Sequence, residues 1–364
     1  MGRYEFRLAH RGDEAELRSL VGRIHMPGKI GLKTLREPDF FEGTHLSPGL
    51  NQTMVCVDGE HDEIVGFGCR SVRTHLVDGA PQPLGYLHML RSVPSVRSGS
   101  LLARAFRFLH QIHGDDETTS YLTTVATGND QALSALTSGR ARLPTYRPLG
   151  EYNTFAIPVR SRRRARSGVE VTSMADVGAE ATVKFINSAA SQHQIFPVYE
   201  VDDFGELAQT FKGLGSSDVL VAVESGEIVG TLGVWDQRSI RQNVVTDYGA
   251  ALGTFRPLYN VFASATRRVS LPPKGQTLPL AAAAVPHVAE DRLDVAHHLL
   301  DAALDRAMAM GIEGLLLGAS GETVWSVVGR ERSEIQYDTN IYEVTWGDHA
   351  GLATAAPYLE LGVL

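Results

Sequence analysis

The 364-residue sequence lacks what several large protein classes require. Its two cysteines, Cys56 and Cys69, form no metal-binding pattern, and we expect them to be reduced residues of a cytoplasmic protein. The longest apolar stretch, 278–285, is too short to span a bilayer, and the charged N-terminus shows no signal peptide. A net charge of −8 argues against general binding of nucleic acid or anionic membranes. The 43% of hydrophobic residues are enough for two ordinary packed cores.

Common motifs for covalent catalysis, phosphate binding and metal binding are also missing. The chain has no Gly-x-Ser-x-Gly, no cysteine with an evident histidine partner, and no Gly-Lys-Ser/Thr phosphate loop. His297 and His298 are adjacent on an expected helix, where neighbouring side chains point about 100° apart and cannot easily share one ion. We therefore expect no metal site and no covalent nucleophile.

The sequence does contain an internal repeat. An expected strand, an acidic turn and Glu63-Ile64-Val65-Gly66 recur as a strand, a turn and Glu227-Ile228-Val229-Gly230. A long apolar helix follows in each half, and each helix precedes another strand. These matches occur in the same order along both halves. The repeat predicts two copies of one α/β unit.

Composition marks a boundary between the two copies. Five arginines gather in a short polar run, which is typical of a solvated linker; the other reading, a nucleic-acid site, lacks interleaved aromatic residues. The expected division is an N-terminal unit over 1–159, a basic linker over 160–167, a C-terminal unit over 168–349 and a tail over 350–364.

The segment 90–100 is the most informative part of the chain. It reads as a strand end, a loop and a helix start, with Leu101, Ala105, Leu109 and Ile112 on one helix face. A helix N-terminus with a glycine and an arginine suits a phosphate, whereas the plainer reading is a serine-capped turn. The residues concerned are Leu90, Arg91, Ser92, Val93, Arg97, Ser98, Gly99 and Ser100.

The order of elements in each half resembles the GNAT superfamily of N-acetyltransferases, and Leu90-Arg91-Ser92-Val93-Pro94 with Arg97 resembles its fourth strand and acyl-CoA loop. Asn129 with Ala132 and Leu133 resembles the segment after its fifth strand. The resemblance implies a mixed, mostly antiparallel sheet flanked by helices in each unit, acetyl-CoA as co-substrate, and direct transfer in a ternary complex. Ser100 and Leu102 stand where the family usually has glycines, and Leu136 replaces a frequent tyrosine.

The second copy departs further from that pattern. Its loop, 287–292, has no glycine and carries two carboxylates that would repel a phosphate, and Ser320 takes the place expected to correspond to Asn129. We therefore expect the first unit alone to hold acetyl-CoA. An insertion over about 236–276 is polar and aromatic, so it lines an acceptor site or packs the two units together.

Acyl transfer to an amine needs a proton acceptor, donors for the oxyanion and a proton for the departing thiolate. His88 on the fourth strand is the candidate base, and backbone N–H groups near Leu90 and Arg91 are candidate oxyanion donors. Tyr146 is preferred over Tyr152 as the acid. All three side chains have a plain structural alternative as packing residues.

Three functions fit these residues. One is an N-acetyltransferase acting on a small-molecule or protein amine, one is a transferase of longer acyl groups, and one is a catalytically silent acyl-CoA or ligand-binding protein. We expect neither a nucleic-acid nor a membrane partner. The sequence does not determine the acceptor, the acyl length or the oligomeric state.

Overall fold

The structure is a computed structural model that describes residues 3–23, 30–96, 99–114, 117–137, 143–160, 168–205, 208–248, 260, 270–346, 351–352 and 357–364. Its strands and helices follow the expected α/β order in both halves. The first half contains β1 (Tyr4–Leu8), α1 (Glu14–Arg23), β2 (Ile30–Leu35), β3 (Leu50–Asp58), β4 (Glu63–Val77), β5 (Ala80–Ser92), α2 (Gly99–His113), β6 (Ser120–Ala126), α3 (Asp130–Leu136) and β7 (Thr145–Pro158).

The second half repeats this order with additions. It contains β8 (Glu170–Ser173), α4 (Met174–Val177), α5 (Ala179–Ser188), β9 (Ile195–Pro197), β10 (Val219–Glu224), β11 (Glu227–Trp235), β12 (Gln242–Tyr248), β13 (Leu280–Val288), α7 (Leu293–Ala309), β14 (Gly314–Ser320), α8 (Val324–Arg332) and β15 (Ile335–Thr345). No helix among the described residues is long and apolar enough to cross a membrane.

The two halves share one mixed sheet with the order β1-β3-β4-β5-β6-β15-β7-β14-β13-β11-β10-β8. Only β5–β6 and β13–β14 are parallel among the described pairs. The order reads as a near-palindrome, in which β1 corresponds to β8, β3 to β10, β4 to β11, β5 to β13 and β6 to β14. The mixed, mostly antiparallel sheet expected for each half is therefore present, and the two copies are joined edge to edge.

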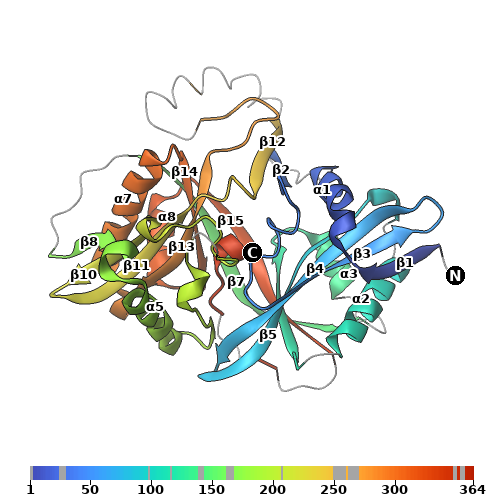
Figure 1. Cartoon of the computed structure of the whole chain (residues 1–364), viewed down its shortest axis with the longest axis horizontal. Coiled ribbons are helices and arrows are strands. Elements are labelled where there is room, and N and C mark those ends of the chain that lie inside the picture. Colours follow the sequence, from blue (N-terminus) through green and yellow to red (C-terminus); the bar gives the residue numbers. More distant parts are fainter. Residues whose placement is uncertain are drawn as a thin grey trace.

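The join is made by an exchange of the last strands. β15, from the end of the second half, pairs with β6 of the first half, and β7, from the first half, pairs with β14 of the second. β7 and β15 also pair with each other along their length in the middle of the molecule (Figure 1). The sequence repeat did not indicate this exchange, and the boundaries at 159 and 168 stay predictions.

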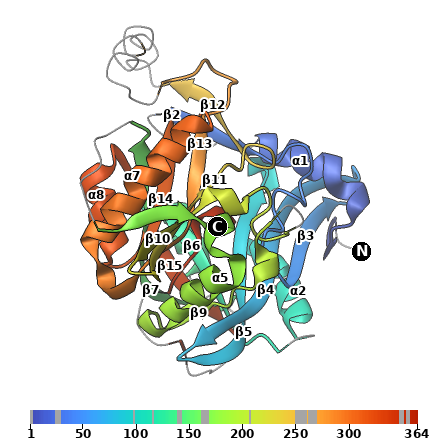
Figure 2. The same cartoon turned by 60° about the vertical axis from the view of Figure 1, so that its left-hand side comes forward.

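Helices cover both faces of the sheet. In the second half, α7 and α8 pack on one face and α5 on the other (Figure 2). In the first half, α1 packs on one face with Phe67 and Cys69, whereas α2 and α3 pack on the opposite face with Leu87 and Tyr121. A smaller sheet pairs β12, from the insertion, with β2 of the first half. The insertion therefore ties the halves together, as one of its two readings expected.

Candidate active site

The repeated Glu-Ile-Val-Gly sequence forms the same bulged hairpin twice. In the first half, the register between β3 and β4 shifts after Cys56 pairs with Gly66. In the second half, it shifts after Ala222 pairs with Gly230. The hairpins at 55–66 and 221–230 are thus equivalent residue by residue, which confirms that the repeat is structural.

A second bulge, on the next strand, is also duplicated. Between β4 and β5 the register shifts from Phe67–Arg91 to Cys69–His88, which leaves Met89 and Leu90 opposite Gly68 alone. Between β11 and β13 the same shift leaves Val285 and Pro286 opposite one residue. Met89 and Val285 both have a positive φ, 53° and 44°, which is uncommon for side chains of this size. The fold imposes this backbone conformation in both halves.

The bulge lies where two parallel strands separate. β5 and β6 pair only through Gly85–Tyr121 and Tyr86–Leu122, although β5 continues to Ser92. The opening begins at Thr123, whose hydroxyl donates to the Leu87 carbonyl at 2.7 Å. Leu90, just beyond, is 52% exposed, which is unusual for a leucine on a central strand. The first half therefore leaves apolar surface and bulged backbone open at one place.

The expected loop and helix follow the bulge. β5 ends at Ser92, a turn covers Pro94–Val96, and α2 begins at Gly99. Arg97 and Ser98 lie outside the described residues, and Ser100 is an exposed residue of the first helical turn. Asn129 caps α3, with its side-chain oxygen accepting from the Ala132 N–H at 3.2 Å. This part of the predicted cofactor site keeps the order that the sequence indicated, and its role stays a prediction.

His88 lies on the face of β5 opposite α2. Its ring stacks on Tyr86 with centroids 5.4 Å apart, and its Nδ1 atom is buried without a hydrogen-bond partner. Burial lowers the pKa of His88 to about 3, and the charges of Arg241 and Arg36 add to this effect. The imidazole is therefore neutral at pH 7 and can accept a hydrogen bond, while its affinity for a full proton is low in the free protein.

The two candidate acids lie elsewhere. Tyr146 is on the α2 face, where its ring packs edge-on against Phe106 and Tyr342, and burial raises its pKa. His88 and Tyr146 therefore flank the sheet from opposite faces. Tyr152 is fully buried between the halves, and its hydroxyl donates to the Leu359 carbonyl at 3.2 Å.

Three arginines lie near one another and near His88; Arg36 is buried, whereas Arg91 and Arg241 are half-buried. They were not predicted as a group from the sequence. Arg36 follows β2, Arg91 is on β5, and Arg241 comes from the insertion. Arg241 donates to the Gly43 carbonyl at 2.9 Å and to the main-chain oxygens of Gly362 and Leu364 at 2.8 and 3.0 Å. These arginines come from distant segments with no shared motif, so no local sequence pattern points to the group.

In the second half, residues from the C-terminal segment 358–361 cover the bulge at Val285, which is equivalent to the bulge at Met89. The Val285 N–H donates to the Glu360 carboxylate at 3.0 Å, and the Tyr358 hydroxyl donates to the same carboxylate oxygen at 2.8 Å. Burial raises the Glu360 pKa to about 7. Leu361 and Tyr152 pack against Gly318 on β14, where a Cβ atom would collide with the Tyr152 hydroxyl. The bulge in the second half is thus filled by the segment 358–361.

The loop over 287–292 in the second half has its cationic side chain engaged in ion pairs. Arg292, the last residue of this loop, forms ion pairs with Glu224 and with Asp294, the latter at 2.8 Å. The structure also corrects one correspondence. Asn129 caps α3 three residues after β6, and the matching residue is Thr323, which caps α8 three residues after β14, whereas Ser320 is the last residue of that strand.

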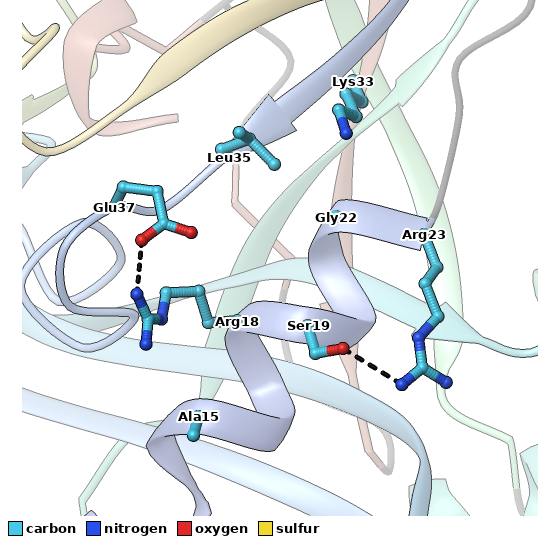
Figure 3. A pocket seen from close by; sticks show the side chains of 8 residues that line it. All are labelled: Ala15, Arg18, Ser19, Gly22, Arg23, Lys33, Leu35 and Glu37. Atoms are coloured by element: carbon cyan, nitrogen blue, oxygen red, sulfur yellow. Dashed lines mark hydrogen bonds and ion pairs between the residues drawn. The ribbon is translucent and has the colours of Figure 1, made fainter. Parts of the chain in front are cut away.

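An open groove of about 450 Å³ lies between α1 and β2, away from the predicted site residues (Figure 3). Arg18 points to Glu37 and also pairs with Glu14 at 3.1 Å, and Arg23 donates to the Ser19 hydroxyl at 3.0 Å. Because these side chains hold one another, we assign no ligand to the groove.

One group of potential metal ligands occurs among the described residues, at the turn between β3 and β4. It consists of Asp58, Glu60 and His61. Arg3 donates to both Asp58 carboxylate oxygens at 3.2 and 2.8 Å, and this contact lowers the Asp58 pKa to about 2. The carboxylate charge is thus already balanced by an arginine.

Comparison with known proteins finds solved structures with a similar fold. No protein-family model and no curated protein matches the chain. Saccharomyces cerevisiae N-myristoyltransferase with bound myristoyl-CoA is similar with a TM-score of 0.60 and 12% identity over 96% of this chain and 80% of its own. A GCN5-related N-acetyltransferase from Sphaerobacter thermophilus gives 0.53 and 13% over 94% and 95%. A glucosamine N-acetyltransferase region of a fungal β-N-acetylglucosaminidase gives 0.55 and 12% over 93% and 38%.

These likenesses show that the chain has the GNAT fold suggested by residues 90–94 and by the order of elements. The coverage extends across both halves. At such low identity the comparison establishes the fold alone, and the chemistry rests on the residues of this chain.

Proposed function

We propose that this protein transfers an acyl group from a CoA thioester to a primary amine, in a ternary complex held by the first half. The observation that carries the proposal is the contrast between the two bulges. The N–H of Val285 points out of the ladder and is taken by Glu360. Met89 has the same register and the same positive φ, beside an exposed Leu90. The first half thus has the same bulged backbone, without the glutamate that occupies the bulged N–H in the second half.

In this proposal the thioester lies in the opening between β5 and β6. The Met89 N–H donates to the developing oxyanion, which places the donor one residue before the expected Leu90 and Arg91. The main chain of Arg91, Ser92 and Val93 and the start of α2 would hold the CoA phosphates, with Arg97, Ser98, Gly99 and Ser100 as predicted and Asn129 on the far side.

The chemistry requires no covalent enzyme intermediate. The amine nitrogen attacks the thioester carbon, an amide bond forms, the carbon–sulfur bond breaks, and the thiolate takes a proton. His88 accepts a hydrogen bond from the amine at its unpartnered Nδ1 and is the candidate base; Tyr146, which burial keeps protonated, is the candidate donor to the thiolate. Burial raises the thiol pKa of Cys56 and Cys69, so neither is an activated nucleophile. A cytoplasmic setting, in which both cysteines stay reduced, is part of the proposal.

Acetyl-CoA is the donor we propose first. A longer acyl chain is the second candidate, because the similar N-myristoyltransferase has bound myristoyl-CoA and Leu90 leaves apolar surface at the bulge. The acceptor is a small-molecule or protein amine.

Two measurements test this function. Calorimetry with acetyl-CoA, myristoyl-CoA and desulfo-CoA measures binding, and thiol release over a panel of amines measures transfer. Binding of desulfo-CoA without transfer from either donor would identify the protein as a silent acyl-CoA binder. Absence of CoA binding would overturn the proposal.

A further inference from the structure

Arg36 and Arg91 have no acidic side chain as a partner among the described residues. Arg36 is 5% exposed, and its guanidinium donates only to the Leu35 carbonyl at 3.1 Å and toward the Met89 sulfur at 3.8 Å. Its Nε atom is buried without a partner. The Nε atom of Arg91 is also buried and unpartnered, and no hydrogen bond or ion pair holds its guanidinium within the described part of the chain. Arg36, which is buried, and Arg91, which is half-buried, thus lack a compensating charge among the described residues.

Nearby carboxylates are all engaged elsewhere. Glu37 pairs with Arg18, Asp39 with Arg11, and Glu42 with Lys212 at 2.7 Å. These three acids lie within six positions of Arg36 in the sequence, but none of them forms an ion pair with it. Burial together with the charges of Arg241 and Arg91 lowers the Arg36 pKa, which reflects the mutual repulsion of the cations. A buried charge without a partner is expensive, so an arrangement of this kind needs a reason outside the folded chain.

Arg36 and Arg91 lie on the α1 face of the sheet. Arg91 pairs across the strands with Phe67, and Phe67 packs in the α1 cluster with Cys69 and Met89. Because side chains alternate between faces, Arg91 points away from α2 and from the expected CoA phosphates. His88 faces the same side, opposite Cys69. The cations therefore lie beside the candidate base.

We propose that the acceptor amine also carries an anionic group, a carboxylate or a phosphate, which binds between Arg36 and Arg91. This inference rests on the acyl transfer proposed above. Guanidinium groups recognise both oxyanions through paired N–H donors. The Arg241 guanidinium, which donates to the main-chain oxygens of Gly43 and Gly362, adds a further positive charge near Arg36. The bound anion would compensate the charges and orient the amine toward His88.

Anion binding is tested first, without any acyl donor. The melting temperature of the intact protein is measured in sodium phosphate, sodium acetate and sodium chloride at equal ionic strength. We expect phosphate or acetate to raise it relative to chloride in the wild type, and Arg91→Met and Arg36→Met to abolish the rise, with Arg91→Lys retaining part of it. Arg292→Met, which removes a cation that already has acidic partners, is the matched control and keeps the rise. An equal rise in Arg91→Met and wild type, or no rise at all, would overturn the proposal.

Acceptor preference is tested next with matched pairs of amines. Glycine is compared with glycinamide to test a carboxylate, and phosphoethanolamine with ethanolamine to test a phosphate. We expect the wild type to prefer the anionic member of one pair, and Arg36→Met to lower kcat/KM for that member about 10- to 100-fold while the neutral member changes less than about twofold. An equal loss for both members would contradict the proposal. If no amine is acylated, the acyl-transfer proposal fails, whereas the melting experiment still decides whether the anion site exists.

Discussion

The bulges at Met89 and Val285 have the same register and the same unusual positive φ, but different side chains surround them. In the first half, the bulge adjoins the exposed Leu90, the buried Arg36 and the half-buried Arg91, and neither arginine has an acidic side chain as a partner among the described residues. In the second half, a glutamate from the tail accepts from the bulged N–H, and an aromatic cluster of Phe196, His287 and Tyr358 fills the space beside it. The two halves therefore keep the same bulged backbone, while in the second half buried side chains fill the space beside it.

The largest effect that separates the two copies should come from His88. We expect His88→Ala to lower turnover at neutral pH about a hundred- to ten-thousandfold with CoA affinity nearly unchanged, because an oriented proton acceptor is lost. The loss should shrink as pH rises, since more of the acceptor amine is then already deprotonated. Steady-state thiol release against pH measures this.

His287→Phe, from the second half, is the matched control and should leave turnover within about threefold, because His287 is remote from the open bulge. An unchanged pH profile in His88→Ala would return His88 to a packing role.

Glu360, which covers the bulge of the second half, should make the free energy of unfolding depend on pH. Its folded pKa of about 7 lies above the ordinary 4.5, so its contribution to stability is complete below about pH 4.5 and is lost as pH rises through 7. Glu360→Gln keeps an oxygen for the Val285 N–H and removes the buried charge. It should be more stable than wild type by about 3 kcal/mol at pH 9 and similar to it at pH 5.

Denaturant unfolding at the two pH values measures this difference. A gain of equal size at pH 5 and pH 9 would mean that the charge is not its cause.

The loops of the two copies should differ in CoA affinity. Arg97→Glu replaces an expected phosphate contact with a repulsive charge and should weaken binding about 10- to 100-fold. Arg292→Glu should change it less than about twofold, because Arg292 already pairs with Glu224 and Asp294. Calorimetric titration with acetyl-CoA compares the two variants. Equal losses would show that both copies bind CoA.

The smallest effect concerns acid stability in the second half. Burial lowers the His287 pKa to about 3, below its ordinary 6.5, so the unfolded chain binds protons first and stability falls as pH drops below 6.5. His287→Phe removes this site and should reduce the loss at pH 5.5 by about 1 kcal/mol. Urea unfolding between pH 7 and 5.5 gives the slope, and a slope equal to that of the wild type would contradict the assignment.

Local patterns predicted the parts of the fold that depend on neighbours in sequence. The paired hairpins followed from alternating strands and a shared Glu-Ile-Val-Gly, and α2 followed from one apolar face. The correspondence of Ser320 with Asn129 was wrong, because a count along the chain places the cap before the helix actually starts at Val324.

The rest depended on contacts between distant segments. β7 and β15 each read as the closing strand of their own half, and only the assembled sheet shows that they are exchanged. Glu360 comes 75 positions after its partner Val285, and Arg36 and Arg241 reach His88 from a loop and from an insertion. No periodicity or short motif predicts contacts between segments so far apart. The contact of Glu360 with Val285 and the position of Arg36 and Arg241 near His88 could therefore be recognised only in the structure.

The strand exchange has a consequence for how this protein is made. On the ribosome, β6 emerges long before β15, its neighbour in the sheet; the Ser120 hydroxyl meets Glu343 across 223 positions. Until then, the first half exposes an open strand edge that could pair with another nascent chain. The chain therefore has to delay closure of its first half, and we expect holdase chaperones to matter more for its yield than for proteins whose repeats close independently.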